Sequence, residues 1–171
     1  TMSIMINTLH DPIDSTPYLQ VDVNSQTLTY VSSSNQVVYT ISTAKKGVGE
    51  VFGSEQTPTG WHMVRAKIGH DQPINTVFVG RRPTGEIYTP DLAAQFENRD
   101  WILTRIFWLS GLELGRNRLG PCDTMRRYVY IHGVPPERIL GTPQSRGCIQ
   151  MHNTDLIELF KKNVTNGMKI I

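Results

Sequence analysis

Cysteine and surplus charge are both scarce in this chain. Only Cys122 and Cys148 occur among the 171 residues, which is too few for a scaffold held together by disulfides. Cys122 follows Gly120-Pro121 in a predicted loop, where nothing fixes its distance from Cys148, so we expect both thiols to be free. The formal net charge is only +2 and no block of Lys or Arg occurs, which argues against a nucleic-acid partner.

Long apolar runs and export features are absent as well. No stretch is apolar enough to cross a membrane, and residues 2–10 lack both the basic region and the apolar core of a secretory signal. We therefore expect a cytoplasmic protein, or a periplasmic one if an export signal has been removed from it. No set of His, Cys and carboxylate residues has the spacing of zinc ligands, and we expect neither a metal nor another cofactor.

What is present suits one domain rich in strands. A chain of 171 residues with 39% hydrophobic residues buries about 70% of the surface that the unfolded chain exposes. We expect the protein to act as a monomer. Leu19, Val21 and Val23 alternate with polar residues, which predicts a half-buried strand. The other predicted strands cover 28–31, 37–41, 77–80, 127–131 and 168–171. A helix is predicted over 156–162, after Asn153 as its N-cap.

Between residues 89 and 119 the apolar pattern becomes helical. The side chains that recur at helical spacing are Leu92, Phe96, Trp101, Ile102, Ile106 and Leu109. They predict either a helical layer that covers the sheet or a helical lid over a functional site, to which Trp101 and Trp108 would contribute. Arg105 lies among them. It would either pair with Asp100 or Glu113, the favoured interpretation, or bind a substrate carboxylate.

An imidazole and a thiol come close together in the C-terminal region. His132 follows a predicted strand, and Cys148 follows the polar turn Ser145-Arg146-Gly147. A lone Cys is more often a small buried apolar residue, but this polar context favours a nucleophile that His132 deprotonates. The turn would also expose the backbone N–H groups of Gly147 and Cys148 to a developing oxyanion.

The sequence around this pair resembles the YkuD family of L,D-transpeptidases. The resemblance rests on His132-Gly133, on residues 141–143 (Gly-Thr-Pro) and on Ser-Arg-Gly-Cys-Ile-Gln-Met over 145–151, and it extends upstream to Tyr18. It implies a mostly-β fold, sandwich-like or barrel-like, with one catalytic domain over 18–171. Residues 1–17 would be an N-terminal extension, and 89–119 a helical lid.

The resemblance also implies roles for single residues. Cys148 matches the nucleophile and His132 the base, Gly147 and Cys148 match the oxyanion donors, and Ser145 matches a residue that orients the site. The residues expected to contact substrate are Gly133, Arg146, Gln150, Arg105, Trp101 and Trp108. Many members have His where Arg146 stands, and Arg or Asn where Gln150 stands, so this chain lacks a fixed charge at Gln150.

The implied reaction is acyl transfer on peptidoglycan stem peptides. Cys148 would attack the bond between the L-centre of a diamino acid and the following D-Ala, and carbapenems would acylate the same thiol. We expect water as the acceptor, which makes the protein an L,D-carboxypeptidase that acts on soluble muropeptides during wall recycling. The alternatives are an L,D-transpeptidase, which cross-links stems or attaches proteins to peptidoglycan, and a peptidoglycan-binding module without turnover. A papain-like protease is excluded because His132 precedes Cys148.

Overall fold

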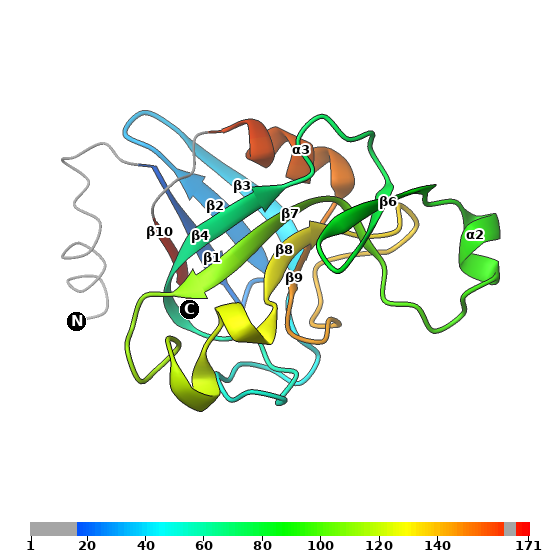
Figure 1. The fold of residues 1–171 in the computed structure, drawn as a ribbon. Coiled ribbons are helices and arrows are strands. Elements are labelled where there is room, and N and C mark those ends of the chain that lie inside the picture. The colour runs from blue at the N-terminus through cyan, green and yellow to red at the C-terminus, as the bar shows by residue number, and fades with distance from the viewer. Residues whose placement is uncertain (1–16, 163–166) are drawn as a thin grey trace.

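Strands dominate the computed structural model, which describes residues 17–162 and 167–171. They form one ten-stranded sheet in the order β4-β10-β1-β2-β3-β9-β8-β7-β5-β6, with an additional pairing of β4 with β7 (Figure 1). Because β4 closes back onto β7, the sheet becomes a barrel from which β5 and β6 project. The mostly-β, barrel-like architecture is thus confirmed. The expected extension over 1–17 lies almost wholly outside the described residues.

The strands and helices have the following bounds. The strands are β1 (Tyr18–Asp22), β2 (Thr27–Val31), β3 (Gln36–Ser42), β4 (Gly60–Ile68), β5 (Thr76–Val79), β6 (Arg82–Ile87), β7 (Ile102–Gly111), β8 (Tyr130–Gly133), β9 (Ile149–Met151) and β10 (Gly167–Ile170). The helices are α2 (Pro90–Ala94) and α3 (Asn153–Lys161), with short 3₁₀ turns η2 (Gly120–Cys122) and η3 (Met125–Arg127). No described helix is long and apolar enough to cross a membrane.

The first three strands form the predicted antiparallel meander. Leu19 and Val21 are fully buried and pair with Tyr30 and Leu28 of β2. Their side chains enter a core that also takes in the buried face of α3, including Leu156. Alternating burial along β1 and β2 therefore sets which face of the meander points inward.

The helical lid predicted over 89–119 is wrong for most of that segment. Only the five residues of α2 are helical, whereas Ile102–Gly111 forms β7, the longest strand. β7 pairs with β4, β5 and β8, and residues on both of its faces are buried. A strand buried on both faces is apolar almost throughout, so its sequence does not alternate and can imitate helical spacing.

The predicted N-cap of the last helix also differs in the structure. The cap position of α3 is His152, and Asn153 is the first helical residue. The Asn153 side chain instead crosses to β7 and to the loop after β8: its Oδ1 accepts from Thr104 Oγ1 at 2.6 Å, and its Nδ2 donates to Val134 O at 2.8 Å. Asn153 thus ties α3 to β7 and to the end of β8.

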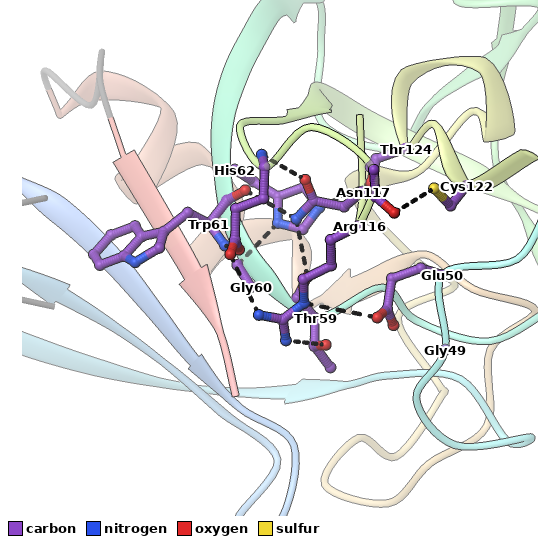
Figure 2. A network of polar contacts seen from close by, with 12 residues as sticks. Gly49, Glu50, Thr59, Gly60, Trp61, His62, Arg116, Asn117, Cys122 and Thr124 are labelled. Atoms are coloured by element: carbon purple, nitrogen blue, oxygen red, sulfur yellow. Dashed lines mark hydrogen bonds and ion pairs between the residues drawn. The ribbon is translucent and has the colours of Figure 1, made fainter. Parts of the chain in front are cut away.

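A buried polar network fixes the loop between β7 and β8 to strand β4 (Figure 2). Asn117 Nδ2 donates to the carbonyls of Thr59 and Trp61, each at 3.0 Å. His62 is fully buried, with Nδ1 3.1 Å from Gly60 O and Nε2 2.9 Å from Thr124 Oγ1. These contacts hold the beginning of a segment that, a few residues later, forms a wall of the functional site.

Candidate active site

The parallel pairing of β8 with β9 brings His132 and Cys148 into one cavity. His132 pairs with Gln150, and Cys148 immediately precedes β9. The backbone N–H of Tyr130 donates to Cys148 Sγ at 3.3 Å, so the sulfur lies against β8 two residues from the imidazole. His132 and Cys148 both line a cavity of about 400 Å³.

The turn before Cys148 is held by Ser145. Ser145 Oγ donates to Cys148 O at 2.5 Å and accepts from Gly147 N–H at 3.2 Å. Gly147 has φ 129, a left-handed conformation that favours glycine, and its carbonyl accepts from Thr57 Oγ1 at 3.0 Å. Ser145 therefore orients the turn.

The same contacts distinguish the two N–H groups that were expected to bind an oxyanion. The N–H of Gly147 is engaged by Ser145 Oγ. The N–H of Cys148 has no hydrogen-bond partner within the described residues. Of the two, Cys148 N–H is therefore the donor that is free for a developing oxyanion.

His132 is oriented and kept neutral by its surroundings. Its Nδ1 lies 2.7 Å from Gly133 O, and because a carbonyl only accepts, Nδ1 carries the proton and Nε2 is the basic nitrogen. Burial lowers the pKa of His132, although the bond to Gly133 opposes that shift. Gly133 thus contributes its carbonyl, and a Cβ at this position would collide with Leu103 O and Asn153.

Cys148 rests as a thiol. Burial raises its pKa to about 12, against the opposing effects of the Tyr130 N–H and of Arg127. A neutral thiol beside a neutral imidazole means that the proton must leave sulfur as the attack occurs. The arrangement suits general-base catalysis by His132 better than a preformed thiolate.

Two of the expected substrate contacts lie at this cavity. Arg146 is exposed and Gln150 is buried, and both line it. Trp108 is not among its lining residues, but its ring lies 6.3 Å from that of Tyr130, which does line it. Trp108 therefore supports the wall of the cavity.

Arg105 and Trp101 are not brought to the site. Arg105 lies on the other face of β7, where its guanidinium lies 5.4 Å from the Phe160 ring and donates to the carbonyls of Gln72 and Thr104. It forms no ion pair with a described residue, so the favoured pairing with Asp100 or Glu113 is absent. Trp101 packs in a separate apolar cluster with Tyr88 and Leu103. The one-residue alternation of a strand puts Ile106, not Arg105, at the cavity.

The contacts of Arg81 and Arg127 at the site were not predicted from sequence. Arg81, at the tip between β5 and β6, stacks over Trp108 at 4.6 Å and Tyr128 at 4.8 Å, and it donates to Tyr130 Oη at 3.0 Å. Arg127 donates to Gln56 O at 2.5 Å and so holds the loop after β3 against the site. The only available signal was a pair of adjacent arginines at each place, which is also common on solvated surfaces.

Comparison with known proteins now decides the family. The sequence model of the L,D-transpeptidase catalytic domain, YkuD, matches residues 16–171. The chain belongs to the YkuD family. It is therefore an enzyme domain of the L,D-transpeptidase kind. No curated protein sequence matches it.

Solved L,D-transpeptidases share the fold of this family member. They include the Mycobacterium smegmatis enzyme (TM-score 0.52, 16% identity, 91% of this chain and 58% of that one). A variant of the Enterococcus faecium enzyme gives TM-score 0.53 and 14% identity, covering 91% of this chain and 50% of that one. L,D-transpeptidase 3 from Mycobacterium tuberculosis, with a faropenem-derived adduct, gives TM-score 0.54 and 12% identity, covering 90% of this chain and 59% of that one. The chain thus spans between a half and three fifths of the length of these structures, and at this identity the likeness shows the fold alone.

Proposed function

We propose that this YkuD domain is an L,D-carboxypeptidase that removes D-Ala from tetrapeptide stems of soluble muropeptides. The observation that carries the proposal is the neutral imidazole of His132 and the thiol of Cys148 in one cavity. Membership of the L,D-transpeptidase family supports the substrate class.

The chemistry follows from the orientation of the two side chains. The Cys148 proton passes to His132 Nε2 while sulfur bonds to the carbonyl carbon after the L-centre of the diamino acid. The carbon–nitrogen bond to D-Ala then breaks, and the imidazolium returns its proton to the leaving amine. Water attacks the thioester with His132 again as base, which restores the thiol. The N–H of Cys148 stabilises the oxyanion in both steps.

The charge around a second cavity supports water as the acceptor. This cavity, of about 220 Å³, also reaches Cys148 and is lined by Arg126, Arg127 and Arg146. Its carboxylate, Glu55, is already paired with Lys46 at 2.9 Å. The positive lining opposes the approach of an ammonium group, whereas water carries no charge to repel.

Transpeptidation is the second candidate, and one observation favours it. The two cavities share Cys148, Tyr128 and Arg146, so a donor stem in one and an acceptor in the other would meet at the same sulfur. Cross-linking or protein attachment would follow if an acceptor amine bound in the smaller cavity tightly enough to exclude water.

Mass spectrometry of a monomeric disaccharide tetrapeptide incubated with the protein separates these functions. Loss of one D-Ala without dimer supports the carboxypeptidase, and dimer as the main product assigns a transpeptidase. Binding of the tetrapeptide with neither product formed would favour the peptidoglycan-binding module. Whether it acts in the cytoplasm, as expected, is tested by fractionation of the cells that make it.

Covalent inhibition offers an independent check on the nucleophile. Solved structures of the family include one described as a complex with imipenem and one as an avibactam carbamoyl enzyme. We therefore expect a carbapenem to add its mass to this protein at Cys148. The absence of an adduct under excess drug would count against Cys148 as nucleophile.

A further inference from the structure

Arg127 lies close to Cys148 but outside the cavity that holds His132. It ends the short turn η3, and Tyr128 then takes a left-handed conformation with φ 55, after which the chain enters β8. The Cys148 thiol contacts this segment, since its Sγ donates to Tyr128 O at 3.6 Å. Arg127 and Cys148 both line the smaller cavity, of about 220 Å³, whereas Arg127 does not line the larger one. A cationic side chain therefore approaches the sulfur from the side away from His132.

The hydrogen bonds of Arg127 all end on neutral acceptors. Its Nη1 donates to Gly49 O at 3.1 Å, and its Nη2 donates to Ser54 Oγ at 3.3 Å and to Gln56 O at 2.5 Å. Burial lowers the pKa of Arg127, and Glu50 opposes that shift without forming an ion pair with it. Within residues 17–162 and 167–171 no carboxylate forms a salt bridge to this guanidinium, which keeps its proton. Its positive charge is therefore not neutralised by an ion pair in this part of the chain.

The loop that Arg127 binds also supports the turn before Cys148. Gln56 O lies 3.4 Å from the position that a Cβ on Gly147 would take. The next residue, Thr57, donates from Oγ1 to Gly147 O at 3.0 Å. The free N–H of Cys148 follows Gly147 directly in the chain. Arg127 thus acts on this N–H through two successive contacts, one from the guanidinium to the loop and one from the loop to the turn.

The charge of Arg127 favours the ionised form of the Cys148 sulfur. Burial raises the pKa of Cys148 and Asp100 raises it further, whereas Arg127 lowers it. Arg126 and Arg146 line the same smaller cavity, but both are exposed, so solvent screens their charges. Arg127 is half-buried and is held by three hydrogen bonds, so its field acts from a fixed position and through less water.

We propose that Arg127 is a positioning residue that stabilises the negative charge forming on the Cys148 sulfur as its proton passes to His132. The hydrogen bonds to the loop after β3 hold the guanidinium in place and keep the Cys148 N–H where an oxyanion forms. The proposal rests on the proposed function only in taking Cys148 as the nucleophile. It applies to water and to an amine as acceptor alike, because it concerns the loss of the thiol proton that precedes either.

Alkylation of Cys148 by iodoacetamide tests the charge apart from substrate binding, because this reagent is neutral and has no carboxylate that an arginine could bind. The sulfur bonds to the methylene carbon of the reagent, iodide leaves, and the thiol proton passes to His132 or to water. Every protein compared carries Cys122→Ser, so that intact-mass spectrometry reports adducts at Cys148 alone. Arg127→Met should slow alkylation about tenfold at about pH 8, the factor expected for a thiol that ionises one pH unit higher.

Arg127→Lys separates the charge from the hydrogen bonds. Lysine keeps the positive charge but cannot reproduce the contacts that the planar guanidinium makes with three acceptors. Arg127→Lys and Arg127→Met should therefore show a similar fall in melting temperature, whereas Arg127→Lys should alkylate within about threefold of the parent. Arg65→Met, on the exposed face of β4, is the control and should match the parent in both measurements.

Two results would overturn the proposal, namely an alkylation rate in Arg127→Met equal to that of the parent, or a rate in Arg127→Lys as low as in Arg127→Met. The second would leave Arg127 as a structural support of the loop. Arg127→Gln keeps an amide donor for the loop carbonyls, so it replaces Arg127→Met if that variant does not fold, and it should be slowed equally. The proposed function fails on a separate observation, the absence of D-Ala release from every tetrapeptide by the parent protein.

Discussion

The backbone N–H of Tyr130 donates a hydrogen bond to the sulfur of Cys148 across 3.3 Å. An N–H donor binds a thiolate more strongly than a thiol, so it favours the negative charge that forms when the proton leaves. The same strand, β8, carries His132 two residues later. One short backbone segment therefore positions both the proposed base, His132, and an N–H group that would stabilise a thiolate at Cys148.

Replacement of Cys148 by Ala should abolish D-Ala release and carbapenem adduct formation while the fold is retained. The side chain is small and lies at the end of a turn that is held by Ser145 and Thr57, so little packing is lost. Activity assays and thermal unfolding by circular dichroism check this together. Cys122→Ser is the matched control and should keep its activity. An active Cys148 variant would show that the nucleophile is misassigned.

His132→Ala should slow acylation of Cys148 by about 10²–10⁴-fold at neutral pH. Burial raises the thiol pKa to about 12, so the variant should regain rate as the pH rises toward that value. In the parent, burial lowers the His132 pKa, so the base stays neutral below the usual histidine value of about 6.5 and activity should persist into mild acid. Stopped-flow acylation by a carbapenem across pH 5–10 measures the pH dependence of the rate in the parent and in the variant. A rate that does not change with pH in the variant would contradict the role of His132 as base.

His62 should make the fold sensitive to acid. Its folded pKa is lowered from 6.5 to about 4, chiefly by burial, so between these values the unfolded chain binds a proton that the folded chain does not. This difference adds about 3 kcal/mol to the free energy of unfolding. The contribution is fully present above the pKa of the unfolded chain and is lost as the pH falls through the folded pKa. Urea unfolding at several pH values should show this loss in the parent and a smaller one in His62→Gln.

His70 provides the control for that measurement, because its side chain is 83% exposed. His70→Gln should keep the acid sensitivity of the parent. His132 acts in the same direction as His62, so some dependence on pH should remain in the His62 variant. An identical pH dependence in His62→Gln and the parent would show that the buried network of Figure 2 does not carry the effect.

Arg105→Ala should reduce stability and leave acylation by a carbapenem nearly unchanged. The guanidinium packs over Phe160 and donates to two carbonyls on the face of β7 opposite the cavity, so its loss should lower the free energy of unfolding by about 1–3 kcal/mol. Chemical denaturation beside acylation kinetics separates the two effects, with Arg65→Ala as the exposed control. A large fall in acylation rate with unchanged stability would instead return Arg105 to the site.

Local sequence pattern was informative where one face of a strand is buried and the other is exposed. Leu19 and Val21 in β1 alternate with polar residues, and this alternation is visible without the fold. In β7, Phe107 and Ile106 are both fully buried although they point to opposite faces, because α3 covers one and the catalytic cavity borders the other. Only the tertiary arrangement separates such a strand from a helix.

The pair that lines the cavity, His132 and Cys148, could be named from sequence because the two residues flank recognisable glycine turns. The contacts of Arg81 with Trp108 and Tyr130 could not, since they join the β5–β6 tip to strands that lie far along the chain. The same holds for Glu97 and Arg138, which line one cavity only after β7 and β8 have paired.

The β5–β6 hairpin joins the barrel through few residues. It pairs with β7 at Val77–Leu103 and Phe78–Ile102, whereas β4 closes the barrel along the other half of β7 (Figure 1). The tip of the hairpin can therefore change in length without opening the barrel, whereas Val77 and Phe78 are buried against residues of β7 and β8. Since its tip places Arg81 over Tyr128 and against Tyr130 in the wall of the cavity, exchange of this one appendage would reshape that wall while β8 and β9 keep His132 and Cys148 in place.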